Sequence, residues 1–324
     1  MGEFDLITRY FRRPVAHAAL GIGDDCALLQ PADGMQLAIS TDMLVEGRHF
    51  LPTVDPARLG HKALAVNLSD LAACGARPLA FTLALALPSA DESWLAGFSR
   101  GLLALADLHG CELVGGDTTR GPLNICITVF GEVPRGQALL RSGARPGDDL
   151  WVSGTLGDAR LALEVFRGTL ALPADAFAAA RLRMEVPTPR VVLGQTLRGI
   201  ATSAVDVSDG LLGDLGHVLA ASGVGATVHT AEVAATMADG LGAHSSEGSS
   251  DADRRLACVL AGGDDYELVF TAPAGARERV LAAGTAASTR VTRIGHIEAA
   301  PGVRLRDGHG RLLDRQYGSF DHFA

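Results

Sequence analysis

Residues 56–87, PARLGHKALAVNLSDLAACGARPLAFTLALAL, hold a predicted helix followed directly by a predicted strand. Proline at position 56 suits the first turn of a helix, and Gly75 suits its end. Between them, apolar residues recur at helical spacing: Leu64, Leu68 and Leu71. From residue 79 to 87 apolar residues alternate with others, which is typical of a half-buried strand. A helix followed directly by a strand indicates a fold that mixes the two.

The rest of the chain continues this interleaving of strands and helices. Strands are predicted at residues 36–41 (ending at Asp42), 111–114, 124–133, 150–153, 204–207, 226–229, 266–272 and 290–299. Helices are predicted from a capping box at Ser89 and Glu92 to Gly110, in segments up to about residue 198, at residues 211–222, and between the last two strands. No repeat of 20 to 50 residues is present. The predicted class is α/β, or α+β with mixed sheets.

The length of 324 residues favours two domains. The turn-rich run RSGARPGDD, at residues 141–149, resembles the entry to a second domain. We therefore predict an N-terminal α/β domain over residues 1–138 and a C-terminal α/β domain over residues 139–324. The Ser, Asp and Glu-rich residues 243–255 are predicted to form a mobile surface loop.

Composition excludes several classes of partner. The chain is 48% hydrophobic and 20% charged, with a net charge of −9 and no long basic run. This argues against a nucleic-acid groove and against an anionic membrane surface. The amino terminus has no apolar signal core, and no apolar run approaches the ~18 residues of a membrane span. A cytoplasmic location is expected.

The cysteines and lysines of the chain exclude several kinds of metal and nucleotide site. The five cysteines are scattered without a C-x-x-C pair, which argues against a disulfide frame or a zinc site. Of the 28 basic residues only Lys62 is a lysine, and both the P-loop and the protein-kinase motifs are absent. Any phosphate chemistry must therefore use metal ions, backbone amides and arginine.

Adjacent aspartates stand in an apolar frame at residues 20–29, LGIGDDCALL. Carboxylates ~4 Å apart repel by roughly 4 kcal/mol at an effective dielectric near 20, so Asp24 and Asp25 form either a surface turn or part of a cation site. More acids stand at predicted strand ends: Asp42, Asp117, Asp206, Asp209, Asp264 and Asp265. Loops at strand ends can point side chains into one crevice, where ligands bind.

Each acid also has a purely structural interpretation. Asp209 is a plausible N-cap for the following helix, and Gly147 with Asp148 reads as an ordinary turn. Asn67 and Asp70 are spaced i, i+3 on a helix, either on a solvated face or directed at a metal. His49 is more often a satisfied or surface histidine than a ligand. Taken jointly, the carboxylates favour a hard cation, magnesium, which in proteins usually also holds substrate phosphates.

The chain resembles the bacterial thiamine-monophosphate kinase family. The resemblance rests on eight motifs in one order: LGIGDDCALL, AISTDMLVEGRHF, KALAVNLSDLAACGA, GGDTTRGPL, LLRSGARPGD, DVSDGLLGDLGH, GGDDYELVF and FDHF. It implies membership of the superfamily of aminoimidazole-ribonucleotide synthetase, with an N-terminal α/β domain that forms a homodimer and a C-terminal α/β domain. The implied reaction is direct in-line transfer of the ATP γ-phosphoryl group to thiamine monophosphate, giving thiamine diphosphate with the help of several magnesium ions.

The resemblance also implies roles for individual residues. Implied magnesium ligands, direct or through water, are Asp25, Ser40, Thr41, Asp42, Asp70, Asp117, Asp206 and Asp209. Implied ATP contacts are Gly116, Asp117, Arg141 and Ser208. Implied thiamine-phosphate contacts are His49, Asp264 and Tyr317. Two of these depart from the family: Asp264 stands where glutamate is frequent, and Tyr317 where tryptophan is frequent. Both keep an acid and an aromatic face suited to a cationic thiazolium.

Other members of the superfamily fit less well. Selenophosphate synthetase needs a reactive cysteine or selenocysteine in an N-terminal Gly-rich loop, but Cys26 follows the aspartates instead. The hydrogenase-maturation protein needs a carboxyl-terminal cysteine, whereas this chain ends DHFA. A non-catalytic module that senses nucleotide or thiamine phosphates would be expected to lose acids from the metal cluster, and none of the matched aspartates is missing.

Overall fold

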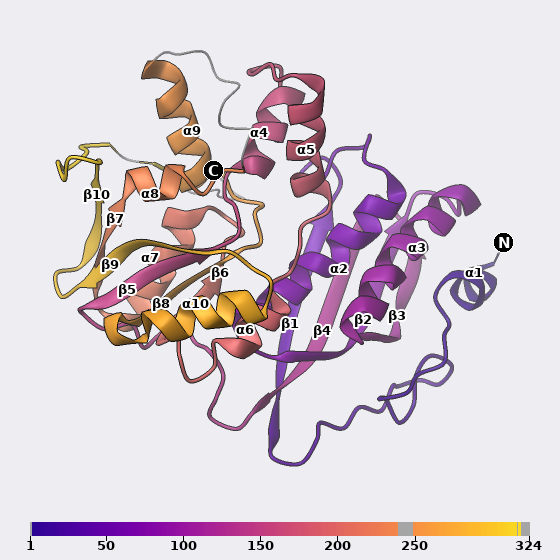
Figure 1. The fold of residues 1–324 in the computed structure, drawn as a ribbon. Coiled ribbons are helices and arrows are strands. Elements are labelled where there is room, and N and C mark those ends of the chain that lie inside the picture. Colours follow the sequence, from indigo (N-terminus) through magenta and orange to yellow (C-terminus); the bar gives the residue numbers. More distant parts are fainter. Residues whose placement is uncertain (1, 239–248, 316, 319–324) are drawn as a thin grey trace. The chain divides into compact units, whose positions relative to one another are not determined.

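A computed structural model describes residues 2–238, 249–315 and 317–318, and the chain forms two compact units (Figure 1). Unit 1 comprises Met1–Leu71 and Ala76–Gly136, and unit 2 comprises Ala72–Gly75 and Gln137–Ala324. Each unit has its own sheet. The predicted fold class, α+β with mixed sheets, is confirmed.

Unit 1 is built on a four-stranded sheet with helices along one face (Figure 1). Its strands are β1 (Met35–Val45), β2 (Arg77–Leu87), β3 (Glu112–Arg120) and β4 (Asn124–Pro134), in the order β1-β4-β2-β3. The β2/β3 pair is parallel, whereas β4 is antiparallel to both β1 and β2. The helices are α1 (Glu3–Tyr10), α2 (Pro56–Ala73) and α3 (Glu92–His109). Alternate residues of β2 and β4, such as Leu85 and Ile127, are buried on one face.

Three details of unit 1 correct the sequence prediction. The N-cap of α3 is Asp91, whose carboxylate accepts the N–H groups of Ser93 and Trp94, and Ser89 lies outside the helix. Strand β1 continues to Val45 because its pairing with β4 continues, so Asp42 lies within the strand. Strand β3 likewise continues past Asp117, which pairs with β2. Neither aspartate ends a strand as predicted.

Unit 2 contains a six-stranded mixed sheet in the order β10-β7-β9-β5-β8-β6. Its strands are β5 (Asp148–Ser153), β6 (Ser203–Asp206), β7 (Gly225–His229), β8 (Leu268–Pro273), β9 (Val291–Glu298) and β10 (Gly302–Arg306). Its helices are α4 (Asp158–Phe166), α5 (Ala174–Glu185), α6 (Val191–Thr196), α7 (Leu211–Ser222), α8 (Thr230–Ala234), α9 (Ser249–Ala261) and α10 (Arg277–Ala286), with a 3₁₀ turn at Ala274–Ala276. One apolar cluster that includes Leu150, Leu215 and Val269 forms its core.

The predicted loop at residues 243–255 is corrected in part. Residues 249–255 form the first turns of α9, and residues 243–248 lie outside the described part of the chain. The helix was missed because its first turns are polar, while its apolar residues, such as Leu256 and Val259, come later. The strand predicted from Tyr266 begins at Leu268, so Asp264 and Asp265 lie in the preceding loop.

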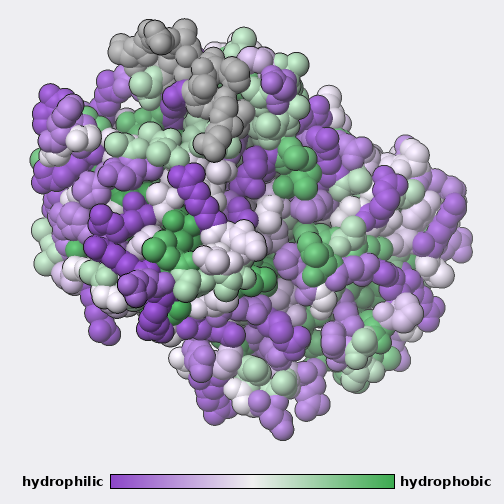
Figure 2. All heavy atoms as spheres, in the orientation of Figure 1, coloured by the Kyte–Doolittle hydropathy of each residue, from purple (hydrophilic) through white to green (hydrophobic). Residues whose placement is uncertain are grey.

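One face of the molecule is drawn in Figure 2. In Figure 2, hydrophilic residues cover most of the visible face and hydrophobic ones form small patches. Among the described residues, no helix is long and apolar enough to cross a membrane.

Candidate active site

Oxygen donors gather in unit 1 where α2 runs beside the edge strand β1. The hydroxyl of Ser40 donates a short hydrogen bond to the carboxylate of Asp70. The backbone N–H of Asp42 donates to Oδ1 of Asn67 at 3.1 Å, and the Asn67 amide donates to the carbonyl of Ala63 at 3.0 Å. Asn67 is only 1% exposed, so this polar face of α2 is turned toward β1 and is not a solvated face. Two carboxylates and a hydroxyl suit a hard cation.

Thr41 and Asp117 belong to the other face of the same sheet. The Thr41 hydroxyl lies 2.8 Å from that of Thr128, across the β1/β4 pair. Asp117 is on β3, the opposite edge strand, in one register row with Met43. Asp117 and Met43 stand at the two ends of that row, three strand spacings or about 14 Å apart. Within one copy of unit 1, Asp117 is therefore not brought beside Asp42.

Gly116 fits its place for a steric reason. Its φ is +145°, and a Cβ there would lie 1.9 Å from the carbonyl oxygen of Leu83. The neighbouring strand thus requires glycine next to Asp117, which is itself exposed. The bare glycine backbone also permits the close approach of a phosphate.

The turn with adjacent aspartates is exposed, and Asp24 shapes it. The carboxylate of Asp24 accepts the N–H of Asp25 at 3.1 Å, and Gly23 has φ +135°. Asp24 is thus a turn residue, and the Asp25 side chain is exposed at the tip of the turn.

His49 lies in a turn that follows β1. Its Nδ1 accepts the N–H of Val45 at 3.0 Å, and its carbonyl accepts the ammonium of Lys62 at 3.4 Å. A ring nitrogen that accepts an N–H is unprotonated, so the neutral ring carries its proton on Nε2. The lone lysine, which is 3% exposed, therefore supports this turn.

In unit 2, three predicted ligands converge with Asp264. Asp206 ends β6 and is 5% exposed, and Ser208 and Asp209 follow in the next turn. The N–H of Asp264 donates to the carbonyl of Ser208 at 2.7 Å. Asp264 has φ +64°, a region that aspartate tolerates better than most residues. Four of the predicted nucleotide, metal and substrate residues of unit 2 thus share the β6 edge of its sheet: Asp206, Ser208, Asp209 and Asp264.

Sequence reasoning missed Asp214, and the structural alternative that it offered for Asp209, an N-cap of the helix, is wrong. The N-cap of α7 is Gly210, and no side chain caps it, so Asp209 is not the N-cap. Instead Asp214, in the first turn of the helix, accepts the N–H groups of three preceding residues. Burial raises the pKa of Asp214 to about 7, although those N–H groups oppose the shift. The available signal was an acid in the first helical turn behind a glycine cap.

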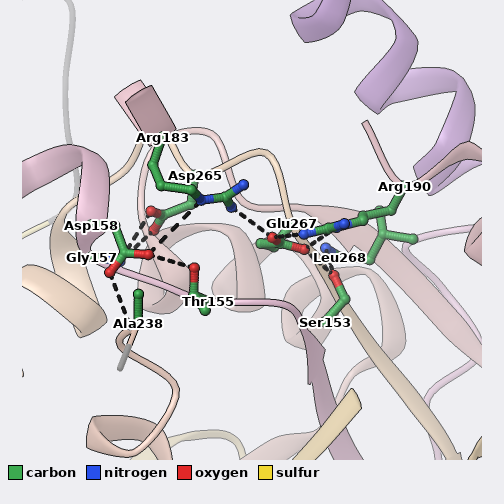
Figure 3. A network of polar contacts seen from close by, with 10 residues as sticks. All are labelled: Ser153, Thr155, Gly157, Asp158, Arg183, Arg190, Ala238, Asp265, Glu267 and Leu268. Carbon is green, nitrogen blue, oxygen red and sulfur yellow. Dashed lines mark hydrogen bonds and ion pairs between the residues drawn. The ribbon is translucent and has the colours of Figure 1, made fainter. Parts of the chain in front are cut away.

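Two buried acids that follow Asp264 in the chain, Asp265 and Glu267, are drawn in Figure 3, and sequence reasoning missed Glu267. Glu267 is fully buried and accepts bonds from Ser153, Arg183 and Arg190 at 2.5–2.8 Å. Asp265 accepts the N–H of Gly157 on both oxygens at 3.0 Å, and burial raises its pKa well above the usual range. These acids are structural supports of the loop that carries Asp264.

Two predicted contacts lie elsewhere in unit 2. Arg141 is exposed, and its carbonyl accepts the hydroxyl of Ser222 at 3.3 Å. Tyr317 is half-buried and packs against the apolar core cluster of the unit. The closing FDHF motif lies outside the described residues.

Comparison with known proteins identifies the family. Residues 23–133 match the family described as AIR synthase related protein, N-terminal domain, and residues 145–308 match its C-terminal domain. Over its whole length the chain is 47% identical to the thiamine-monophosphate kinase of Salmonella typhimurium, of which it covers 98%. The chain therefore belongs to the thiamine-monophosphate kinase family.

Solved structures of the family agree. The thiamine-monophosphate kinase of Stenotrophomonas maltophilia is 47% identical with a TM-score of 0.82, and the match covers 92% of each chain. The structure "AaThiL complexed with AMPPCP and TMP" is 29% identical with a TM-score of 0.76, over 91% of this chain and 89% of that one. Hydrogenase maturation protein HypE of E. coli, at 23% identity and a TM-score of 0.78, shares the fold.

Proposed function

We propose that this chain transfers the γ-phosphoryl group of ATP to thiamine monophosphate, giving thiamine diphosphate and ADP. The observation that carries the proposal is the full-length identity of 47% to a thiamine-monophosphate kinase. A relative at 29% identity was solved with AMPPCP and TMP bound. The acceptor is already an ionised phosphate, so the barrier lies in bringing two polyanions together rather than in activating a hydroxyl.

Several magnesium ions are part of the proposal, since the donors of this chain fit them. Among the described residues, no three His, Cys, Asp or Glu side chains form a cage for a metal. Magnesium bound with phosphates takes one or two carboxylates and keeps its waters. Asp70, which is bonded to Ser40, and Asp42, whose backbone is bonded to Asn67 on the same helix as Asp70, fit that requirement. Held by these residues, magnesium would supply positive charge that offsets the negative charge of the phosphates.

The other magnesium ligands follow the family motifs. We assign this role, direct or through water, to Asp25 and Thr41 in unit 1 and to Asp206 and Asp209 in unit 2. Asp117 joins them from the second edge strand of unit 1.

The remaining residues bind and orient the two substrates. Gly116 lets the nucleotide approach the backbone, and Arg141 offers a planar fork for phosphate oxygens, with Ser208 as a further ATP contact. His49 offers Nε2–H to the substrate.

Recognition of the thiazolium falls to two residues of unit 2. Asp264 supplies a negative charge, and Tyr317 supplies an aromatic face for the cationic ring.

A homodimer through β1 is also part of the proposal. One face of this eleven-residue edge strand exposes Leu37, Ile39 and Met43 by 42%, 60% and 52%. A long apolar edge is a liability unless another chain covers it, and a two-fold axis lets the same strand of a second copy do so. Ile39→Asp should shift sedimentation from dimer to monomer, whereas Leu108→Asp, at a residue 76% exposed on α3, should not. A dimeric Ile39→Asp variant would exclude β1 as the contact.

The activity is tested with purified protein, ATP, magnesium and two acceptors, with products identified by mass. Thiamine diphosphate should form from thiamine monophosphate, and unphosphorylated thiamine should be inert. Turnover of thiamine, or none with either acceptor, would refute the proposal. A cytoplasmic location is also part of the proposal.

A further inference from the structure

Two segments of unit 2 that are distant in sequence are hydrogen-bonded into one structure. We call residues 207–210 the Ser208 turn and residues 262–266 the Asp264 loop. The β6/β8 pairing continues beyond the strands, because Val207 N–H donates to Glu267 O at 2.7 Å and Tyr266 N–H donates to Val207 O at 2.8 Å. The Asp264 N–H completes the row at Ser208 O, at 2.7 Å. A shift of the Ser208 turn must therefore move Asp264.

Glycines make this contact too close for independent motion. A Cβ on Gly263, at φ +70°, would lie 2.7 Å from the carbonyl oxygen of Ser208. A Cβ on Gly210, at φ +115°, would lie 2.9 Å from the carbonyl carbon of Ala261. The backbones thus touch with no side chain between them, and interiors packed this closely transmit displacement.

One side chain holds the Ser208 turn from the other side. Oδ2 of Asp214 accepts the N–H groups of Ser208, Asp209 and Gly210, each at 3.1 Å. Asp214 is 3% exposed, so water cannot replace it. These donors surround the start of α7, where the N-cap glycine has no side chain to satisfy them. A single carboxylate oxygen therefore fixes three successive peptide units.

We propose that Asp214 is a positioning residue for phosphoryl transfer, acting through the Ser208 turn on both substrates. It holds Ser208 and Asp209, which carry the nucleotide and metal roles, and through the backbone row it holds Asp264, which carries the thiamine-phosphate role. This inference rests on the proposed function. It assigns to Asp214 a role beyond capping a helix: it sets the relative position of nucleotide and acceptor groups in unit 2.

The test compares Asp214→Asn with a matched variant, Asp148→Asn. Asp148 is also a buried acid of unit 2, 5% exposed, and its Oδ2 accepts the N–H of Arg145 at 3.0 Å and the hydroxyl of Thr202 at 2.7 Å. It lies at the opposite end of the sheet, where Asp148 pairs with Pro273. Both variants should lower Tm, since each weakens hydrogen bonds to a buried acid.

Catalysis should separate the two variants. Asp214→Asn should lower kcat/KM about tenfold for both ATP and thiamine monophosphate, because an amide oxygen is a weaker acceptor than a carboxylate oxygen for the three N–H groups. It should also raise the magnesium concentration needed for half-maximal rate. Asp148→Asn should change neither value of kcat/KM, nor the magnesium concentration for half-maximal rate, by more than twofold. Asp214→Ala should lower kcat/KM further than Asp214→Asn does. If the Ala variant does not fold, the kinetics of the Asn variant test the inference.

Failure of the inference is distinguishable from failure of the proposed function. An active wild-type enzyme whose Asp214→Asn variant keeps its kcat/KM and magnesium dependence would reduce Asp214 to a helix cap. If the wild type does not turn over thiamine monophosphate, the proposed function fails, and calorimetric binding of magnesium with AMPPCP still tests the inference. Asp214→Asn should then weaken that binding about tenfold, and unchanged affinity would overturn the positioning role.

Discussion

Removing the charge of Glu267 should destabilise unit 2 more than any exposed ion pair does. Glu267 is fully buried, while the side chains of Arg183 and Arg190 that pair with it are 23% and 15% exposed. Glu267→Gln keeps the volume and the Ser153 contact but removes the anion that both largely buried arginines share, and Arg183 keeps only Asp158, at 3.9 Å, among the described residues (Figure 3). Removing one member of a buried pair typically costs about 3–5 kcal/mol. At roughly 2–4 °C per kcal/mol for a unit of this size, Tm should fall by about 10 °C.

The measurement is guanidinium unfolding followed by tryptophan fluorescence. Trp151 is 4% exposed, stacks on Phe270 in the unit 2 sheet, and reports unit 2 alone in a Trp94→Phe background. The control is Asp253→Asn, which breaks a pair with Arg315 whose side chains are 48% and 52% exposed. That change should cost at most about 1 kcal/mol. A Glu267→Gln loss equal to the control, with the same denaturant slope, would refute the reasoning.

Three further outcomes follow from the site and from an ion pair. Asp42→Asn should reduce turnover about 100-fold or more with Tm preserved, because metal binding contributes several kcal/mol of charge stabilisation; near-normal turnover would remove Asp42 from the metal site. Gly116→Ala should destabilise unit 1 by about 1–3 kcal/mol, since its Cβ would meet Leu83 O at 1.9 Å, and fluorescence of unit 1 would show it. Hydrogen bonds from Arg277 lower the pKa of Asp149. This stabilisation is present above the unfolded pKa of about 3.9 and is lost as pH falls through the lower folded pKa, so Arg277→Gln should reduce the acid dependence of Tm.

The sequence predicted elements whose periodicity is local. Helix α2, strand β2 and helix α7 lie within two residues of their predicted bounds, because apolar spacing and glycine stops act within one element. The prediction failed where pairing with another strand sets the length: β1 and β3 run past Asp42 and Asp117 because β4 and β2 remain beside them. The residues of a strand do not show how far its pairing with a partner strand distant in sequence will continue.

In the candidate site, too, local motifs were predictable from the sequence and contacts set by strand pairing were not. Motifs located Ser208, Asp209 and Asp264, and the structure joins them through one backbone hydrogen bond. They could not indicate that Asp117 and Asp42 belong to opposite faces and opposite edges of one sheet. Register decides that, and a shift of one residue reverses every side chain.

Because backbone amides can bind acidic side chains, an acidic motif alone does not show whether its carboxylate supports the fold or acts in the active site. Glu112 accepts N–H groups from three residues at 2.6–3.1 Å, just as Asp214 does in the other unit. Several peptide N–H donors stabilise a carboxylate without a cation, and the carboxylate fixes those peptides in return. The chain, with a single lysine, therefore stabilises buried acids with amides and arginines. In DVSDGLLGD, the sequence does not distinguish the roles of Asp209 and Asp214. The structure does, because the Asp214 carboxylate accepts three N–H groups and one of them belongs to Asp209.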